Sequence, residues 1–189
     1  MPVTVYVDIS PISPTFTIHP ATTPTQIAQA RTLIEAYANW LDLDLTFQSF
    51  SSELSSLPGS YAPPSGRLLL AFTISDEAIG VIGLRRLPSS KSGKEAELKR
   101  LYVLPSARGS GAGRALVEAA IDAARKEGYE KLRLDTLGHM MGAIGLYESF
   151  GFKQVEAYYE TPLEGTVFLE LDLIKSRDQA HGGQVNMSD

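Results

Sequence analysis

The stretch Arg100-Leu101-Tyr102-Val103-Leu104-Pro105-Ser106-Ala107-Arg108-Gly109-Ser110-Gly111-Ala112-Gly113-Arg114-Ala115-Leu116 carries the strongest local signal in this chain. An apolar run typical of a strand leads into three glycines spaced two apart, and these run directly into an amphipathic helix predicted over about 111–127. Glycine lets the backbone turn tightly, and a helix start adds unpaired N–H groups and the positive end of its dipole. Arg108 and Arg114 flank the turn with positive charges. We therefore predict a pyrophosphate-binding turn rather than a flexible connection.

Two other nucleotide-binding motifs can be compared with this turn. The chain has no Gly-Lys-Ser/Thr after the glycines, which excludes a P-loop NTPase. A Rossmann NAD-binding site stays open as an alternative, because Asp135 ends the next predicted strand about 20 residues on, where a ribose-binding acid would lie. Against it, Arg114 stands in place of the third fingerprint glycine, several strands and a helix precede the turn, and no second βαβ half follows.

The elements around this turn predict a mixed fold. Thr23 and Gln26 form a capping-box pattern with Pro24 at the first helical position, which starts a helix over about 24–42. Periodicity and turn residues give the remaining elements: strands over 16–19, 67–73, 78–87, 96–104, 131–136, 152–159 and 166–173, helices over 111–127 and 140–150, and a short helix with a loop over 45–66. The last two strands are expected to form a hairpin around Glu164-Gly165. Helices interrupting a mostly antiparallel set of about seven strands indicate an α/β (α+β) fold.

Composition limits the domain organisation and the partners. A chain of 189 residues with 43% hydrophobic and 21% charged residues is expected to form one domain, over 1–175. Residues 1–15 are expected to be extended, and the polar, aperiodic stretch 176–189 to be a flexible tail. The 17 basic and 22 acidic residues give a net charge of −5, so neither nucleic acid nor an anionic membrane is an expected partner.

The chain has few groups for metal or covalent chemistry. It has no cysteine, which removes thiolate ligands and cysteine nucleophiles, and its histidines at 19, 139 and 181 form no paired-ligand motif. We expect no metal site. Neither a signal-peptide pattern nor an apolar run of membrane-spanning length is visible, and we expect a cytoplasmic protein.

Two motifs make the chain resemble the GCN5-related N-acetyltransferase (GNAT) superfamily. Arg108-x-x-Gly111-x-Gly113 matches the family's acetyl-CoA signature, and Ala143-x-x-Leu146-Tyr147-x-x-x-Gly151-Phe152 matches its second signature. The resemblance covers about residues 16–173 in element order and extends to a common, substrate-unassigned subgroup. It implies direct transfer of an acetyl group from acetyl-CoA to an amine, without a covalent enzyme intermediate and without a metal.

The resemblance also implies where the cofactor lies. A slot for CoA is expected where the fourth and fifth strands splay apart, with the pantetheine arm along residues 101–103 and the pyrophosphate on the backbone of residues 108–114. The cofactor-binding residues implied in this way are Leu101, Tyr102, Val103, Arg108, Gly109, Ser110, Gly111, Ala112, Gly113 and Arg114.

Catalytic roles follow from the same resemblance. Tyr147 matches the tyrosine of the family's Leu-Tyr pair and is the candidate acid that protonates the leaving thiolate. Glu97 matches a position that bears a general base in many members, often acting through water; the alternative is a solvated charge. Met140 departs from the pattern, because the family often has an asparagine there that contacts the cofactor arm. Neighbouring His139 is more typical of a cap or surface residue than of a base, and Asp135 of a strand-end hydrogen-bonding residue.

The acceptor is left open between a small-molecule amine and a peptide amine. The acidic N-terminal third favours a cationic amine, or it serves only to solvate the surface. A homodimer is also left open. A non-catalytic acyl-CoA sensor that keeps the glycine-rich turn is the alternative from another functional class; the presence of both Tyr147 and Glu97 favours an enzyme.

Overall fold

A computed structural model describes residues 16–41 and 49–174. The extended segment expected over 1–15, the tail expected over 176–189 and the last residue of the helix expected over 24–42 lie outside the described residues. The prediction of one domain over 1–175 stays a prediction.

A seven-stranded sheet organises the described part of the chain, in the order β1-β2-β3-β4-β5-β7-β6. Neighbouring strands are antiparallel except β4 and β5, which run parallel. This confirms the predicted mostly antiparallel, mixed sheet. The strands are β1 Phe16–Pro20, β2 Arg67–Thr73, β3 Ala78–Arg86, β4 Glu95–Val103, β5 Lys131–Leu137, β6 Lys153–Val155 and β7 Thr166–Asp172.

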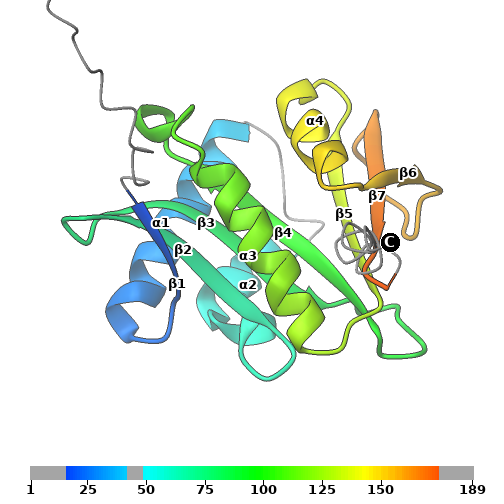
Figure 1. The fold of residues 1–189 in the computed structure, drawn as a ribbon, viewed down its shortest axis with the longest axis horizontal. Helices are drawn as coiled ribbons and strands as arrows, with labels where there is room; N and C mark the ends of the chain where they lie inside the picture. The colour runs from blue at the N-terminus through cyan, green and yellow to red at the C-terminus, as the bar shows by residue number, and fades with distance from the viewer. Residues whose placement is uncertain (1–15, 42–48, 175–189) are drawn as a thin grey trace, which may run out of the picture.

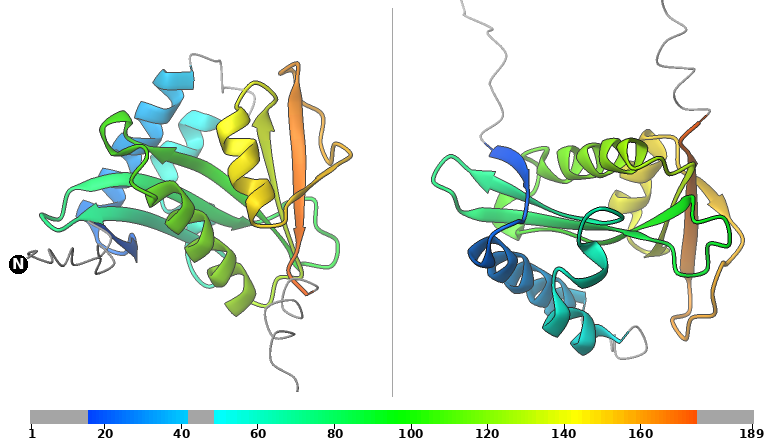
Figure 2. Two further views of the ribbon diagram at one scale, coloured as in Figure 1. Left: turned by 45° about the horizontal axis from the view of Figure 1, so that its top comes forward. Right: turned by 90° about the horizontal axis from the view of Figure 1, so that it is seen from below.

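Helices cover both faces of the sheet. The helices are α1 Pro24–Leu41, α2 Phe50–Ser56, α3 Ala112–Lys126 and α4 Met141–Ser149. Seen edge-on in Figure 2, α3 and α4 lie on one face of the sheet and α1 and α2 on the other. The apolar face of α3, including Leu116 and Ala120, is fully buried in the core on its side, and Ala30 and Ile34 of α1 are fully buried on the other. The capping box at α1 forms as predicted, with Gln26 N donating to Thr23 Oγ1 at 3.2 Å and Thr23 N donating to Gln26 Oε1 at 3.1 Å.

The sheet opens between its two parallel strands. Residues 95–97 of β4 pair with residues 131–133 of β5, and no pairing between the two strands continues beyond Glu97 and Arg133. Figure 1 shows β4 and β5 diverging from there, with α4 beside β5 and α3 running across β4. The predicted splay between the fourth and fifth strands is confirmed.

A bulge in β4 changes which side chains share a face. Arg100 has a φ of 61°, and the register between β3 and β4 shifts opposite it, between Val81 and Gly83. Before the bulge Leu98 packs in the core beneath α3, and after it Leu101 packs against the same core. Strict alternation along a strand would put the neighbouring Lys99 and Arg100 on opposite faces, but the extra residue at the bulge lets both side chains reach the same two cavities described below.

The expected strand 152–159 was too long. The structure pairs only residues 153–155 with β7, and residues 156–165 leave the sheet as a loop. Tyr158 and Tyr159 in this loop pack edge-on against Phe168, with ring centroids 5.0 Å and 5.1 Å away. Packing of these two rings on Phe168 therefore takes the place of the strand pairing that alternation predicted for residues 156–159.

Candidate active site

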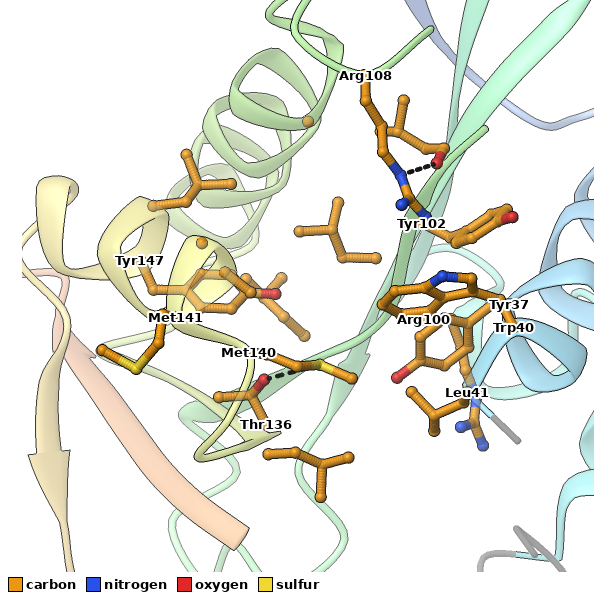
Figure 3. Close-up of a pocket in the computed structure, with 18 of the residues that line it drawn as sticks. Tyr37, Trp40, Leu41, Arg100, Tyr102, Arg108, Thr136, Met140, Met141 and Tyr147 are labelled. Carbon is orange, nitrogen blue, oxygen red and sulfur yellow. Dashed lines mark hydrogen bonds between the residues drawn. The ribbon is translucent and has the colours of Figure 1, made fainter. Parts of the chain in front are cut away.

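A cavity of about 770 Å³ fills the slot between β4 and β5. Side chains and backbone from α1, β4, β5, α4 and the glycine-rich turn line it. Figure 3 shows Tyr147 on one side of this pocket, facing Tyr37 and Trp40 of α1 on the other. Of the ten predicted cofactor-binding residues, the cavity is lined by Leu101, Tyr102, Val103, Arg108, Gly109, Gly111, Ala112 and Gly113.

The glycine turn, by which we mean residues 108–114, has the backbone that a phosphate ligand needs. Gly109 and Gly111 have φ angles of 80° and 89°, a region in which a side chain costs about 1–2 kcal/mol. A Cβ built at either position meets no atom within 4 Å, so the chain itself does not fill the space in front of these residues. Gly111 is the N-cap of α3, whose first N–H groups have no intrahelical partners. Ser110 Oγ accepts a hydrogen bond from Ala112 N at 3.3 Å.

The two arginines of the turn take different directions. Arg108 lies over the slot, with its guanidinium carbon 4.8 Å from the Trp40 ring centroid. Arg114 turns to the end of α4, donates to Ser149 Oγ at 2.9 Å and lies 4.5 Å from the Phe150 ring centroid. Arg114 and Ser110 do not line the slot, so a cofactor role for these two rests on the sequence alone.

Tyr147 is held on the wall of the slot by α4. Its side chain is buried, its ring packs edge-on against Phe152 at 5.6 Å, and its hydroxyl points into the pocket in Figure 3. Burial, followed by the nearby Tyr37 and Asp135, raises the pKa of Tyr147 above the ordinary value of a phenol. The hydroxyl therefore stays protonated at neutral pH, which a proton donor requires.

Glu97 lies on a second, smaller cavity of about 250 Å³ and does not line the slot. Its carboxylate is buried and occupied: Oε2 accepts from Arg85 Nε at 2.9 Å and Nη2 at 2.7 Å, and Oε1 accepts from Tyr158 Oη at 3.1 Å. The structure therefore does not bring Tyr147 and Glu97 into one cavity. The two cavities meet at Lys99 and Arg100, which line both.

Ion pairs fix the boundary between the two cavities. Arg100 donates through Nε and Nη2 to the two carboxylate oxygens of Glu53 at 2.9 Å and 3.0 Å. Lys99 Nζ donates to Asp135 Oδ1 at 2.7 Å, so Asp135 is hydrogen-bonded as expected, but it lies within β5 rather than at its end, and it lines the slot. Glu53, one of the acidic residues of the N-terminal third, is thus already paired with a cation of the chain.

Sequence reasoning missed four aromatic residues at these cavities. Tyr37 and Trp40 line the slot, and Tyr158 and Tyr159 line the second cavity. The first two follow the helical period of α1 and were indistinguishable from its packing face, while the other two were placed in a strand. The Tyr37 hydroxyl also points into the pocket in Figure 3, and burial is the main cause of its raised pKa.

Met140 and His139 both line the slot. The sulfur of Met140 accepts a hydrogen bond from Thr136 Oγ1 at 3.7 Å, so the side chain that stands in place of the family's asparagine is anchored to β5.

Residues 16–41 and 49–174 contain no cluster of three or more side chains able to hold a metal ion. No helix in the same ranges has both the length and the apolar character needed to cross a bilayer. The cytoplasmic location stays a prediction.

Comparison with known proteins agrees with this geometry. Residues 31–152 match the model of the acetyltransferase (GNAT) family. An uncharacterized N-acetyltransferase of Schizosaccharomyces pombe is 36% identical over 152 residues, which cover 80% of this chain and 91% of the relative.

Solved structures show the same fold. A GNAT-family acetyltransferase from Staphylococcus aureus superposes with a TM-score of 0.68 at 19% identity, over 84% of this chain and 99% of that one. A Salmonella typhimurium protein solved with its cofactor acetyl-CoA superposes with a TM-score of 0.60 at 20% identity, over 84% of this chain and 94% of that one.

Proposed function

This chain belongs to the GNAT acetyltransferase family, and we propose on that premise that it transfers the acetyl group of acetyl-CoA directly to an amine of a small molecule or peptide. The observation that carries the proposal is the splayed slot between β4 and β5, with the glycine turn at one end and Tyr147 on its wall. Family membership excludes the Rossmann alternative. The described sheet excludes it as well, because a Rossmann sheet is mostly parallel and here only β4 and β5 are parallel neighbours. Membership of an acetyltransferase family also favours an enzyme over the non-catalytic sensor.

The residues of the slot fit acetyl-CoA, which would supply the activated acetyl thioester. We assign the pyrophosphate to the N–H groups of the glycine turn and to Arg108, because the open backbone at Gly109 and Gly111 presents donors and positive charge together. The pantetheine arm would lie along residues 101–103. Leu104 N donates to Ile79 O of β3. Because the N–H and C=O of one peptide unit point in opposite directions, the carbonyl of Val103 faces away from β3, toward the slot between β4 and β5.

Tyr147 is the proposed acid of the reaction. Its hydroxyl would give a proton to the sulfur that leaves when the amide forms. Tyr147→Phe should lower turnover of an accepted amine by about 10²-fold or more while leaving acetyl-CoA affinity within twofold. Tyr129→Phe is the matched control, because Tyr129 Oη bonds Ser65 O outside both cavities. Equal turnover for Tyr147→Phe and wild type would remove Tyr147 from the mechanism.

Glu97 is the proposed acceptor of the amine proton, reached through Tyr158. Arg85 occupies one carboxylate oxygen, and the phenol of Tyr158 bonds the other, so a proton arriving from the second cavity would pass through Tyr158 Oη. The amine would approach through the second cavity and meet the thioester at the boundary formed by Lys99 and Arg100. Glu97→Gln should lower turnover of an accepted amine by about 10²-fold or more while leaving acetyl-CoA affinity within twofold, whereas unchanged turnover would exclude Glu97 as the base.

A thermal-shift screen with acetyl-CoA, CoA, NADH and ATP tests the cofactor. A ligand at 100 times its Kd stabilises the folded state by about 2.7 kcal/mol, which corresponds to a rise in Tm of about 5 to 11 °C for a chain of this size. We expect acetyl-CoA and CoA to give this rise. A rise with NADH and none with millimolar acetyl-CoA would overturn the proposal. Amines of both classes, screened by release of free CoA thiol, would then identify the acceptor.

A further inference from the structure

Trp40 is a large aromatic residue that lines the slot without being buried in the core. It lies in the last turn of α1, remains 48% exposed and lines the slot on the side opposite Tyr147. It is the only tryptophan of the chain. Its ring centroid lies 6.3 Å from that of Tyr102, and the two rings form one aromatic surface on the α1 side of the slot.

Arg108 reaches from the glycine turn onto this aromatic surface. Its guanidinium carbon lies 4.8 Å from the Trp40 centroid and 5.9 Å from the Tyr102 centroid, and its Nε donates to Val103 O at 3.3 Å. No described residue accepts a hydrogen bond from either of its Nη atoms. Among the described residues, the side chain is therefore oriented by two ring faces and one carbonyl, and neither terminal nitrogen donates to any of them.

The second arginine of the turn is used differently. Arg114 donates a hydrogen bond through Nη1 to Ser149 Oγ and lies over the Phe150 ring, outside the slot. Of the two arginines in the turn, Arg108 is thus the one whose charge stands at the slot, and Trp40 is its nearest aromatic contact.

We propose that Trp40 is a positioning residue for cofactor binding, which holds the guanidinium of Arg108 in place for the pyrophosphate. The inference rests on the proposed function, since it assumes that the slot binds CoA. A mobile arginine loses side-chain freedom when it binds a phosphate, and a guanidinium already held over an indole loses less of it. An indole is the ring that attracts a cation most strongly, so α1 acts on the phosphate end of the slot through Arg108.

A double-mutant cycle on the full chain tests this role. Trp40→Leu should raise the Kd of acetyl-CoA, measured by calorimetry, about three- to tenfold, and Trp40→Phe, which keeps a weaker aromatic face, should raise it less. In an Arg108→Gln background the same Trp40→Leu change should alter the Kd by less than twofold, because the group it positions is gone. Phe150→Leu is the matched control beneath the other arginine and should leave the Kd within twofold of wild type.

S-Acetylpantetheine, which lacks the pyrophosphate, distinguishes positioning of Arg108 from direct packing on the pantetheine arm. Its affinity, measured by NMR line broadening, should be the same in wild type and Trp40→Leu. An equal loss for S-acetylpantetheine and acetyl-CoA would overturn the proposal, as would an undiminished effect of Trp40→Leu in the Arg108→Gln background. So would a Kd for acetyl-CoA within twofold of wild type in the Trp40→Leu chain.

The wild-type measurement separates this inference from the proposed function. Failure of wild type to bind acetyl-CoA contradicts the proposed function itself, whereas normal wild-type binding with an unaffected Trp40→Leu variant contradicts only the role of Trp40. Circular dichroism of each variant checks folding, and the emission of Trp40, the single tryptophan, should change on addition of CoA in wild type.

Discussion

Replacing Glu53 by glutamine should destabilise the protein strongly, because it leaves the guanidinium of Arg100 buried without its counter-charge. The side chains of Arg100 and Glu53 are 3% and 9% exposed, and two hydrogen bonds join them. Arg100 also lies 5.1 Å from the Phe50 ring centroid and occupies the left-handed backbone region at the β4 bulge. The ion pair therefore holds in place the residue at which the two cavities meet.

The magnitude follows from the burial of the pair. Removing one partner of a buried ion pair costs about 3–5 kcal/mol, mainly because the remaining charge is left uncompensated. Tyr61 Oη also donates to Glu53 Oε1, at 2.9 Å. Glutamine keeps an oxygen that can accept from Arg100 or Tyr61, so we expect the lower end of that range. For a chain of this size, about 3 kcal/mol lowers Tm by about 6 to 12 °C.

The pH dependence gives a second signature of the same pair. Burial alone raises the pKa of Glu53, but the hydrogen bond and charge of Arg100 outweigh burial, and the pKa lies below its ordinary value. A lowered pKa in the folded state means that the stabilisation is complete above the unfolded pKa of about 4.3 and is lost as the pH falls through the folded value. The gap in stability between wild type and Glu53→Gln should therefore be constant from pH 7 to 5 and narrow at lower pH.

Urea unfolding followed by circular dichroism at several pH values measures both effects. Glu130→Gln is the matched control, because the Lys94–Glu130 pair is 58% and 42% exposed and should contribute no more than about 0.5 kcal/mol. A loss below about 1 kcal/mol for Glu53→Gln at pH 7, or a loss equal to that of Glu130→Gln, would refute the reasoning.

Three glycine substitutions give further predictions, each measured by urea unfolding. Gly111→Ala should cost about 1–2 kcal/mol through its φ of 89° alone, since no atom lies within 4 Å of the added Cβ; a neutral result would contradict the assigned backbone. Gly145→Ala, in an exposed and open position on α4, should instead stabilise by about 0.5–1 kcal/mol, and a loss of stability would contradict its helical assignment. Gly83→Ala should cost about 1–3 kcal/mol, because its Cβ would lie 2.5 Å from Cε1 of buried Tyr61, and wild-type stability would show that the ring can move.

Local signals in the sequence were sufficient for most of the elements. The capping box at Thr23, the apolar period of α3 and the glycines after β4 act over a few residues, so the structure follows them closely. The expected strand over 152–159 failed for the converse reason. Tyr158 and Tyr159 pack against Phe168, which lies more than eight residues further along the chain. The alternation of apolar and polar residues within the segment cannot predict such a contact.

The fold class, the family and the position of the glycine turn could all be predicted from the sequence, because each depends on consecutive residues or on motifs of fixed spacing. Tertiary structure alone decided that Arg108 turns toward the slot and Arg114 away from it, since each is oriented by an aromatic ring supplied by another element. It also decided that Glu97 is shared by Arg85 and Tyr158, and that a bulge at Arg100 brings Lys99 to the boundary of both cavities. These contacts join β3, β4 and the loop after β6, and only the folded sheet brings those segments together.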